Sequence, residues 1–397
     1  MAGALMLLAA GTGGPAAART AGGPVTLIDA GRTHACALDD DGRAYCWGSG
    51  DSGELGNGDT TDRSIPVLVR APAAGVSFTR ITGGDAHTCG LGSDAGAYCW
   101  GTNSYHQLGN GDALDRSTPV AVNAPAGVEF TQIAAGGAHT CGLSSEGRAY
   151  CWGSSSLGEM GSGDGAGIRS MPAAVHAPAG VTFTQVTAGS SFSCALASNL
   201  TAYCWGVGLS GQLGNGANRI QPTPVPVHAP EGAGFTQLTA GRDHVCGLGS
   251  DTLAYCWGSG GFGRLGDGDT TDRSAPVPVR APEGVSFIQL TAGGDHTCGL
   301  GSDTLAYCWG TGSLGQLGNG AAVDSPAPVA VHAPAGVVLT QLSAGSGYTC
   351  GVGSDARAYC WGANEEHQLG DGGTESRLVP GAVPIPAPHR GHMAAGR

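Results

Sequence analysis

The cysteines are the residues of this 397-residue chain whose spacing most clearly indicates chemistry. All 14 fall into pairs, and the two members of each pair stand ten positions apart. The pairs are Cys36/Cys46, Cys89/Cys99, Cys141/Cys151, Cys194/Cys204, Cys246/Cys256, Cys298/Cys308 and Cys350/Cys360. Such a pair can close a small disulfide loop worth roughly 2 to 3 kcal/mol of stability. Two alternatives stay open: buried free thiols, and zinc ligands, which are less favoured because no Cys-x-x-Cys occurs.

Each cysteine pair lies in a stretch that predicts a β-hairpin. In the first copy, residues 36–38 lead into a Gly/Asp turn and residues 44–47 return. If Cys36 lies opposite Cys46, then Ala37 lies opposite Tyr45, whose ring needs a small cross-strand neighbour. The residue after the first cysteine is Ala or Gly in every copy. Opposed Cα atoms are about 4.5 to 5.5 Å apart, so we expect seven disulfides and an oxidising compartment.

The hairpin recurs every 52 or 53 residues, a period typical of repeat architectures. Each period holds four short β-like segments with no room for a crossover helix. In the second copy these are residues 78–81, 87–91, 97–100 and 119–122. Repeated seven times, they predict an all-β fold, a seven-bladed β-propeller of four-stranded antiparallel blades. We expect the C-terminal strand, residues 379–385, to join the N-terminal blade and close the ring.

Composition narrows the possible partners. The net charge is −13, and all 18 cationic residues are arginines without a basic cluster, so we expect no nucleic-acid binding. The acidic balance favours solubility. The 73 glycines recur at fixed places in each unit, which indicates tight turns.

The two ends differ from the repeats. Residues 1–24 resemble a secretory signal peptide or a disordered leader, although a positive start is missing. Residues 25–385 form the expected propeller, and residues 386–397 a disordered tail. No apolar run approaches the roughly 20 residues of a membrane span, so we expect no transmembrane segment. The leader and the cysteines together favour a secreted, periplasmic or cell-surface protein.

No arrangement of residues predicts catalysis. Acidic stretches at residues 59–62 and 267–272 suggest calcium, but they lack the alternating oxygen ligands of a calcium loop and are typical of Asx turns. No Ser/His/Asp, metal or phosphate-loop pattern stands out. We therefore expect no catalytic residue, no metal and no cofactor.

Four recurring motifs carry a family resemblance: Gly-x-x-His-Thr/Ser-Cys-x-Leu, Tyr-Cys-Trp-Gly, Gly-Gln-Leu-Gly-Asn-Gly and Pro-Val-x-Val. Together they resemble the repeats of the regulator of chromosome condensation family, over residues 25 to about 385. The resemblance implies a seven-bladed propeller. The family includes a nuclear guanine-nucleotide exchange factor, a plant UV-B photoreceptor and secreted bacterial inhibitors of β-lactamases. The cysteine-paired form is similar to the exported bacterial members.

By resemblance to the exchange factor, the loop before each second strand implies a partner-binding face. The candidate residues are Arg32, His34, Asp85, His87, Arg242, Asp243, His244, Asp295 and His296. For the histidines a packing or strand-capping role is favoured, because Phe192 and Tyr348 replace them in two copies. Nothing in the geometry of a blade requires the charges of the Asp and Arg residues.

The expected function is a secreted, monomeric, non-enzymatic scaffold that binds another protein, whose identity the sequence does not give. One alternative is guanine-nucleotide exchange on a small GTPase, which would need reduced cysteines in the cytosol. The other is a glycan-binding propeller.

Overall fold

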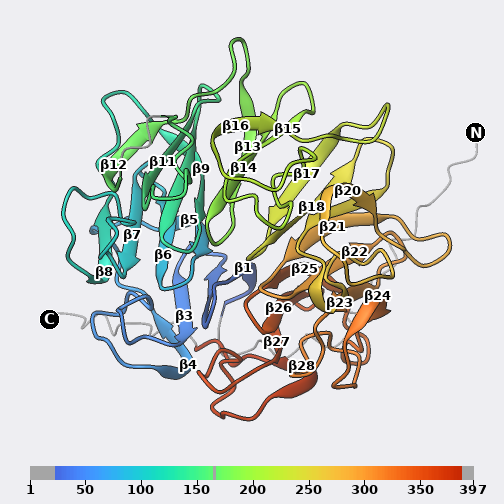
Figure 1. Cartoon of the computed structure of the whole chain (residues 1–397). Coiled ribbons are helices and arrows are strands. Elements are labelled where there is room, and N and C mark those ends of the chain that lie inside the picture. The colour runs from blue at the N-terminus through green and yellow to red at the C-terminus, as the bar shows by residue number, and fades with distance from the viewer. Residues whose placement is uncertain (1–22, 164–166, 387–397) are drawn as a thin grey trace, which may run out of the picture.

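The computed structural model describes residues 23–163 and 167–386. These residues form seven four-stranded sheets, each built from consecutive strands. Figure 1 shows the sheets following one another around a ring, from the blue first blade to the red last blade. The predicted all-β, seven-bladed propeller is therefore confirmed.

The strands are grouped here by their position in the blade, and blades 1 to 7 are numbered in chain order. The first strands are β1 Val25–Ala30, β5 Phe78–Gly83, β9 Phe130–Ala135, β13 Phe183–Ala188, β17 Phe235–Ala240, β21 Phe287–Ala292 and β25 Leu339–Ala344. The second strands are β2 His34–Asp39, β6 His87–Gly92, β10 His139–Ser144, β14 Phe192–Ala197, β18 His244–Gly249, β22 His296–Gly301 and β26 Tyr348–Gly353. The third strands are β3 Ala44–Gly48, β7 Ala97–Gly101, β11 Ala149–Gly153, β15 Ala202–Gly206, β19 Ala254–Gly258, β23 Ala306–Gly310 and β27 Ala358–Gly362. The fourth strands are β4 Arg63–Leu68, β8 Arg116–Ala121, β12 Arg169–Ala174, β16 Gln221–Pro226, β20 Arg273–Pro278, β24 Ser325–Ala330 and β28 Arg377–Ala382.

The predicted hairpin register is confirmed in every blade. Cys36 lies opposite Cys46 and Ala37 opposite Tyr45, and the other six hairpins repeat this pairing. The reason for the small residue differs from the expected one. A methyl group on Gly90 would lie 2.7 Å from Cδ1 of Phe78, so the aromatic ring of the first strand restricts this position most closely.

All seven predicted cysteine pairs are disulfides, each joining the second strand of a blade to the third. Their Cα atoms lie 4.0 to 4.1 Å apart, somewhat closer than expected from the sequence. The bonds are Cys36–Cys46, Cys89–Cys99, Cys141–Cys151, Cys194–Cys204, Cys246–Cys256, Cys298–Cys308 and Cys350–Cys360. No free cysteine is left over, which removes the free-thiol and zinc alternatives. Disulfides persist in oxidising compartments, so the bonds suggest such an environment for this chain.

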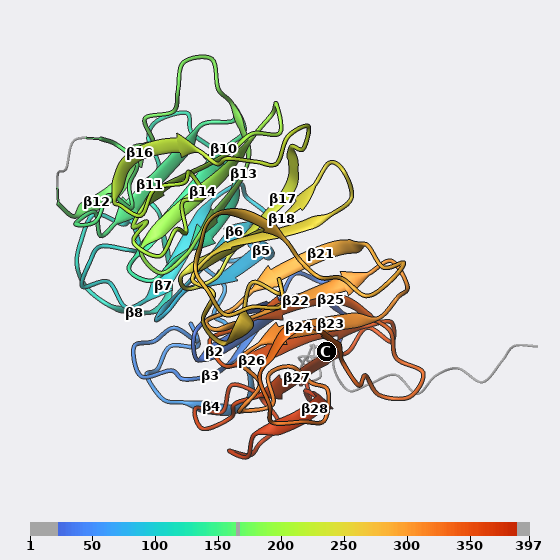
Figure 2. The same ribbon diagram turned by 45° about the vertical axis from the view of Figure 1, so that its right-hand side comes forward.

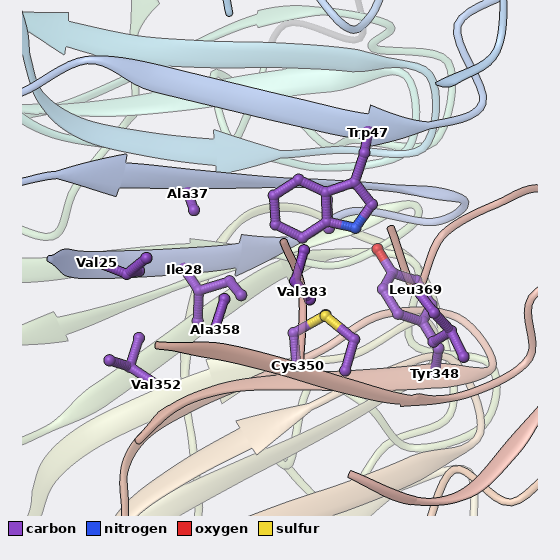
Figure 3. Packing of buried hydrophobic residues seen from close by; sticks show 12 residues of the cluster. Val25, Ile28, Ala37, Trp47, Tyr348, Cys350, Val352, Ala358, Leu369 and Val383 are labelled. Carbon is purple, nitrogen blue, oxygen red and sulfur yellow. A yellow bond between two sulfur atoms is a disulfide. The ribbon is translucent and has the colours of Figure 1, made fainter. Parts of the chain in front are cut away.

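The two faces of each blade differ, and each fits the opposite face of its neighbour. Between blades 6 and 7, Cys298, Leu300 and Cys308 pack with Tyr359 and Trp361. Figure 3 shows the matching interface between blades 7 and 1, where Cys350 and Ala358 lie near Ile28 and Trp47. Every other interface repeats this arrangement, and all seven tryptophans are fully buried. Burial of aromatic rings at each interface holds the blades together.

The predicted ring closure is wrong. Strand β28 pairs with β27 of its own blade, and blade 1 is complete with β4 beside β3. Because the repeats begin with a first strand and end with a fourth strand, no blade lacks a strand that another blade would have to supply. Blades 7 and 1 instead meet side by side, as both ribbon views show (Figures 1 and 2). Trp47 Nε1 donates to the Gln368 carbonyl across this junction at 2.9 Å.

A ring of glycines surrounds the propeller axis at the end of the first strands. Its members are Gly31, Gly84, Gly136, Gly189, Gly241, Gly293 and Gly345. A Cβ on any of them would lie 2.3 to 2.7 Å from the carbonyl oxygen of the next glycine in the ring. The amide that follows donates across the junction, for example Arg32 N to Gly84 O at 3.1 Å. This close approach fixes where the next residue of each loop stands.

The predicted leader and tail lie almost entirely outside the described residues, so those expectations stay predictions. Within residues 23–163 and 167–386, no helix is long and apolar enough to cross a membrane. The one helix in these ranges is the short 3₁₀ turn η1, Gly261–Gly263.

Thiol labelling followed by intact-mass measurement tests the disulfides. We expect no label on native protein and 14 labels after denaturation and reduction, because every cysteine is bonded. A Cys298→Ala/Cys308→Ala variant should lose roughly 2 to 3 kcal/mol of unfolding free energy. Labelling of native protein without reductant would contradict the assignment.

Candidate functional site

The loops between first and second strands surround a cavity of about 270 Å³ on the propeller axis. After each ring glycine, one residue per blade stands at its mouth: Arg32, Asp85, Gly137, Ser190, Arg242, Gly294 and Ser346. Three of the predicted site residues, Arg32, Asp85 and Arg242, are thus brought together. Asp243 follows directly, and we call Arg32, Asp85, Arg242 and Asp243 the charged mouth.

Opposite charges alternate within the charged mouth. Arg32 Nη1 lies 3.9 Å from Asp85 Oδ2, and Arg242 Nε lies 3.6 Å from Asp243 Oδ2. Partial burial raises the pKa of Asp85, while the positive charges of Arg32 and Arg242 oppose that rise. Since all four side chains stay at least 42% exposed, these pairs add little stability and remain available to a partner.

Asp295 lies apart from the charged mouth. Its Oδ1 is 2.8 Å from Nη1 of Arg264, which comes from the preceding blade and is almost fully buried. The Arg264 carbonyl also accepts a hydrogen bond from Thr297 at 2.8 Å. Asp295 therefore helps to join two blades. Its side chain is also partly exposed.

The predicted histidines are not at the surface. His34, His87, His244 and His296 are fully buried, as is His139. The Nε2 atom of each lies 2.8 Å from a hydroxyl of the next blade. The four candidates therefore offer no atom to an external partner, and the packing role favoured from the sequence fits their positions. The partner-binding hypothesis is narrowed to the charged residues.

The proton positions of this network follow from its acceptors. The Thr88 hydroxyl donates to the Glu54 carbonyl at 2.7 Å, so it must accept from His34 Nε2–H. Nδ1 of His34 is buried and has no hydrogen-bond partner within the described residues, so a second proton there would have no acceptor. The imidazole is therefore neutral. Burial lowers the pKa of His34 to about 4 and of His87 to about 3.

The sequence contains a signal for this network that is visible only when adjacent blades are compared. A histidine faces Thr or Ser in the next blade, at Thr88, Thr140, Ser193, Thr297 and Thr349. Phe192 instead precedes a blade with Val245 at that position, and Tyr348 precedes the blade with Ala35. The Tyr348 hydroxyl donates to the backbone carbonyl of His34 in blade 1, 2.5 Å away, and the Gly31 carbonyl lies 3.2 Å from it. The residue types thus change together across each interface.

The loops after the third strands carry exposed apolar residues that sequence reasoning missed. In an antiparallel blade these loops leave the same edge as the loops of the charged mouth. At or beside the loop tip stand Tyr105, Leu157, Leu209, Phe262 and Leu314, with exposed fractions of 37% to 63%. We call these five residues the apolar tip ring. The corresponding tips of blades 1 and 7 carry Ser52 and Glu366.

The Gln-Leu-Gly motif holds each tip in place. Gln107 Oε1 accepts from the backbone amide of Tyr105 at 3.0 Å, and Gln316 does the same for Leu314 at 2.9 Å. The Leu of the motif is buried, as Leu108 shows. The carbonyl of the Gln position accepts from a tryptophan of the next blade in six interfaces, for example from Trp152 at 2.9 Å. Six of the seven tips are therefore anchored to the next blade by a tryptophan, and in blade 5 the Arg264 carbonyl accepts from the Thr297 hydroxyl of the next blade instead.

Blade 1 uses a glutamate at this anchoring position. Glu54 accepts from the Ser52 amide at 2.9 Å and from the Ser49 hydroxyl at 3.1 Å. Burial raises the pKa of Glu54 to about 7.

The acidic stretches adopt ordinary turns. Asp59 accepts from the Thr61 amide at 3.1 Å, and Asp269 accepts from the Thr271 amide at 2.7 Å. Arg63 and Arg273 pair with these aspartates. The prediction of Asx turns is confirmed for both stretches. Carboxylates of residues 39–41 also lie close together, but that of Asp39 already pairs with Arg43 at 2.7 Å.

Family models cover nearly the whole propeller. The regulator of chromosome condensation (RCC1) repeat matches residues 41–91, 94–143, 146–196, 201–248, 252–300, 304–352 and 355–396. A second model of the same repeat matches residues 25–54, 78–107, 130–159, 183–212 and 339–368. This chain belongs to the RCC1 repeat family.

Several relatives share the RCC1 repeats. The ultraviolet-B receptor UVR8 of Arabidopsis thaliana is 31% identical over 90% of this chain and 81% of its own length. The human E3 ubiquitin-protein ligase HERC2 is 29% identical over 86% of this chain, but only 7% of that protein is covered. Among solved structures, Prp20p from Saccharomyces cerevisiae has a TM-score of 0.76 at 22% identity, over 91% of this chain and 86% of that chain. Human WBSCR16 has a TM-score of 0.77 at 20% identity, over 87% and 94%. The two solved structures support the fold alone.

The histidine network of this RCC1 propeller can be tested by a double substitution. One histidine and its hydroxyl partner are replaced by an apolar pair like Phe192 and Val245. The buried histidines bind protons more weakly than in the unfolded chain, so their stabilisation is present above the ordinary pKa of about 6.5 and is lost as the pH falls toward their folded values. One histidine should contribute roughly 1.5 kcal/mol to the loss between pH 6.5 and 5. His87→Phe/Thr140→Val should therefore reduce the pH dependence of urea unfolding by that amount.

The matched control is Phe192→His, which places a histidine opposite Val245 with no hydroxyl to bind. We expect it to lower the unfolding free energy by about 1 to 3 kcal/mol at pH 7.5. An unchanged acid dependence in the double variant would show that the histidines are not neutral in the folded protein.

Glu54→Gln tests the tip anchor of blade 1. The raised pKa means that folding favours the protonated acid, so its stabilisation is present below about pH 4.5 and is lost as the pH rises through 7. The substitution should raise the unfolding free energy at pH 8 by about 1 to 3 kcal/mol and have little effect at pH 5. The reverse change, Gln316→Glu, should destabilise at pH 8. Equal effects at both pH values would argue against a buried, titrating Glu54.

Proposed function

We propose that this protein is a non-enzymatic scaffold that binds another protein through the face formed by the apolar tip ring and the charged mouth. The observation that carries the proposal is the apolar tip ring. Five consecutive blades display Tyr, Leu or Phe to solvent at or next to the matching loop position. The glutamine anchor bonds the backbone of the tip, so it does not require an apolar side chain there. Clustered exposed apolar residues are a feature of protein interaction surfaces, and Tyr and Phe are enriched in such interfaces.

The charged mouth supports the same face. Arg32, Asp85, Arg242 and Asp243 are exposed, and the equivalents of the first three in other blades are Gly or Ser. Charges from blades 1 and 2 face those from blade 5 across a ring that is otherwise small and neutral. Charges placed this way can orient a docking partner. Solved structures of relatives concern the binding of Prp20p to Gsp1p and histones, and of yeast RCC1 to Kap60. These relatives support protein binding as a use of the fold, but they do not identify the partner of this chain.

Secretion is part of the proposal. Seven disulfides in a chain of this length favour an oxidising compartment over the cytosol. The similarity to the ectodomain of the plant receptor kinase CR4, with a TM-score of 0.54 at 25% identity, is compatible with a location outside the cell. We propose that residues 1–24 direct export and that the propeller acts as a monomer.

Site-directed photo-crosslinking tests the proposed face. A photo-reactive phenylalanine analogue at Leu209 or Leu314 should give a specific crosslinked product in the native envelope or culture supernatant. The same analogue at Ala74, which is exposed on a loop at the opposite end of the blades, should not. Leu209→Asp/Leu314→Asp should weaken binding of the captured partner about tenfold or more without lowering stability, because both side chains are solvent-exposed. Crosslinking from Ala74 alone would place the interface elsewhere.

A further inference from the structure

Glutamines of the first strands form bridges between neighbouring blades. Gln185 is a complete example: its Nε2 donates to the Leu238 carbonyl at 2.7 Å, and its Oε1 accepts from the Leu238 amide at 2.9 Å. The same kind of bond to the backbone of the next blade is made by Gln132, Gln237, Gln289 and Gln341. Five of the seven junctions therefore use glutamine at this position. A glutamine here satisfies backbone groups and adds to the cohesion of the ring.

Blade 2 carries Arg80 where five blades carry glutamine. Across residues 23–163 and 167–386, we find no hydrogen bond or ion pair that involves the Arg80 guanidinium, and the residue is exposed. Blade 1 has Leu27 at this position, and an aliphatic side chain cannot form the glutamine-type bridge. An arginine here gives up the two hydrogen bonds of a glutamine without gaining a partner inside the protein. Its charge is therefore available to an external ligand.

Two adjoining cavities on the propeller axis share Arg80, and we call them together the axial channel. Arg80 lines a cavity of about 680 Å³ together with Leu27, Ile81 and Gln132. It also lines an adjoining cavity of about 480 Å³ beside Gln341 of blade 7. Both lie toward the start of the first strands, at the end of the axis opposite the charged mouth. The larger volume is within the usual range for small-molecule sites, about 300 to 1,000 Å³.

The chemistry of the cavity limits what could occupy it. Arg80 is the only cation among the lining residues described for the two cavities. The walls combine aliphatic side chains such as Leu27, Ile81 and Val186 with amide and hydroxyl groups. A single guanidinium matches one carboxylate through two parallel hydrogen bonds, whereas phosphate sites usually gather several donors. The aliphatic wall would contact an apolar body attached to that carboxylate.

The one carboxylate among these lining residues does not neutralise Arg80. Asp29 Oδ2 accepts from the Gly83 amide at 2.7 Å, and Oδ1 lies 3.4 Å from the Ser343 hydroxyl. Asp29 thus bridges blades in the manner of the threonines at its equivalent positions, such as Thr187, which accepts from the Ala240 amide. Its oxygens point to these donors, so the guanidinium remains available.

We propose that the axial channel binds a small organic monocarboxylate with an apolar body, and that Arg80 binds its carboxylate. The site uses the opposite end of the axis from the proposed protein-binding face. It therefore does not depend on that function.

Calorimetric titration of the full chain with octanoate and with phenylacetate tests the site, with octanamide as the uncharged counterpart. We expect at least one carboxylate to bind and octanamide to bind about tenfold more weakly or not at all. Arg80→Gln should weaken carboxylate binding about tenfold or more. The same variant should keep or raise the thermal stability, because the introduced glutamine restores the bridge that five other blades use.

Two controls separate the outcomes. Arg219→Gln removes another exposed arginine from a loop at the other end of the blades and should leave binding unchanged. Leu209→Asp/Leu314→Asp should also leave carboxylate binding unchanged. Loss of the protein-binding face can therefore be distinguished from loss of the channel site. The proposal is overturned if neither carboxylate binds at about 10 mM. It is equally overturned if octanamide binds as well as octanoate, or if Arg80→Gln binds as tightly as the native chain.

Discussion

The interface between adjacent blades is the interaction on which the rest of the structure depends. A single blade of four short strands has two large apolar faces and cannot bury either alone. The disulfide face of one blade covers the Trp and Tyr face of the next, as Cys298 and Trp361 show. Since the seventh disulfide face meets the first tryptophan face, the ring closes by the same packing that builds it. This explains why no strand needs to be exchanged between the first and last blades.

Features within one repeat could be predicted from the sequence, because they follow from spacing and alternation. The ten-residue spacing and the small residue opposite Tyr45 determined the hairpin register, and with it the disulfides. Features between repeats were harder to predict. The change from His34 with Thr88 to Phe192 with Val245 is present in the sequence, but it becomes meaningful only when a residue is compared with the following blade. The error in the ring closure has the same origin, because it concerned how two distant blades meet.

The candidate site was predicted only in part for a related reason. Sequence reasoning found the loop that carries Arg32, Asp85 and Arg242, because its residues vary while the flanking motifs do not. It favoured a packing role for the histidines but kept them among the candidates, since they and the exposed charges stand within three residues of the same glycine ring. The apolar tip ring was missed because apolar residues in a loop are common singly. Their significance depends on the shared loop geometry, which places them on one face.

The structure therefore divides the repeat into two kinds of position. Trp100, Leu108 and Gly109 pack against a neighbouring blade, and a change at such a position would disturb an interface. Tyr105 and Arg80 stand at positions where other blades carry different residues, and neither contributes a side-chain hydrogen bond that the fold requires. A repeat protein can change its ligand at the second kind of position while the first kind preserves the ring. Because tips and channel residues belong to opposite ends of the same blades, one propeller can present two independent surfaces without any change in blade packing.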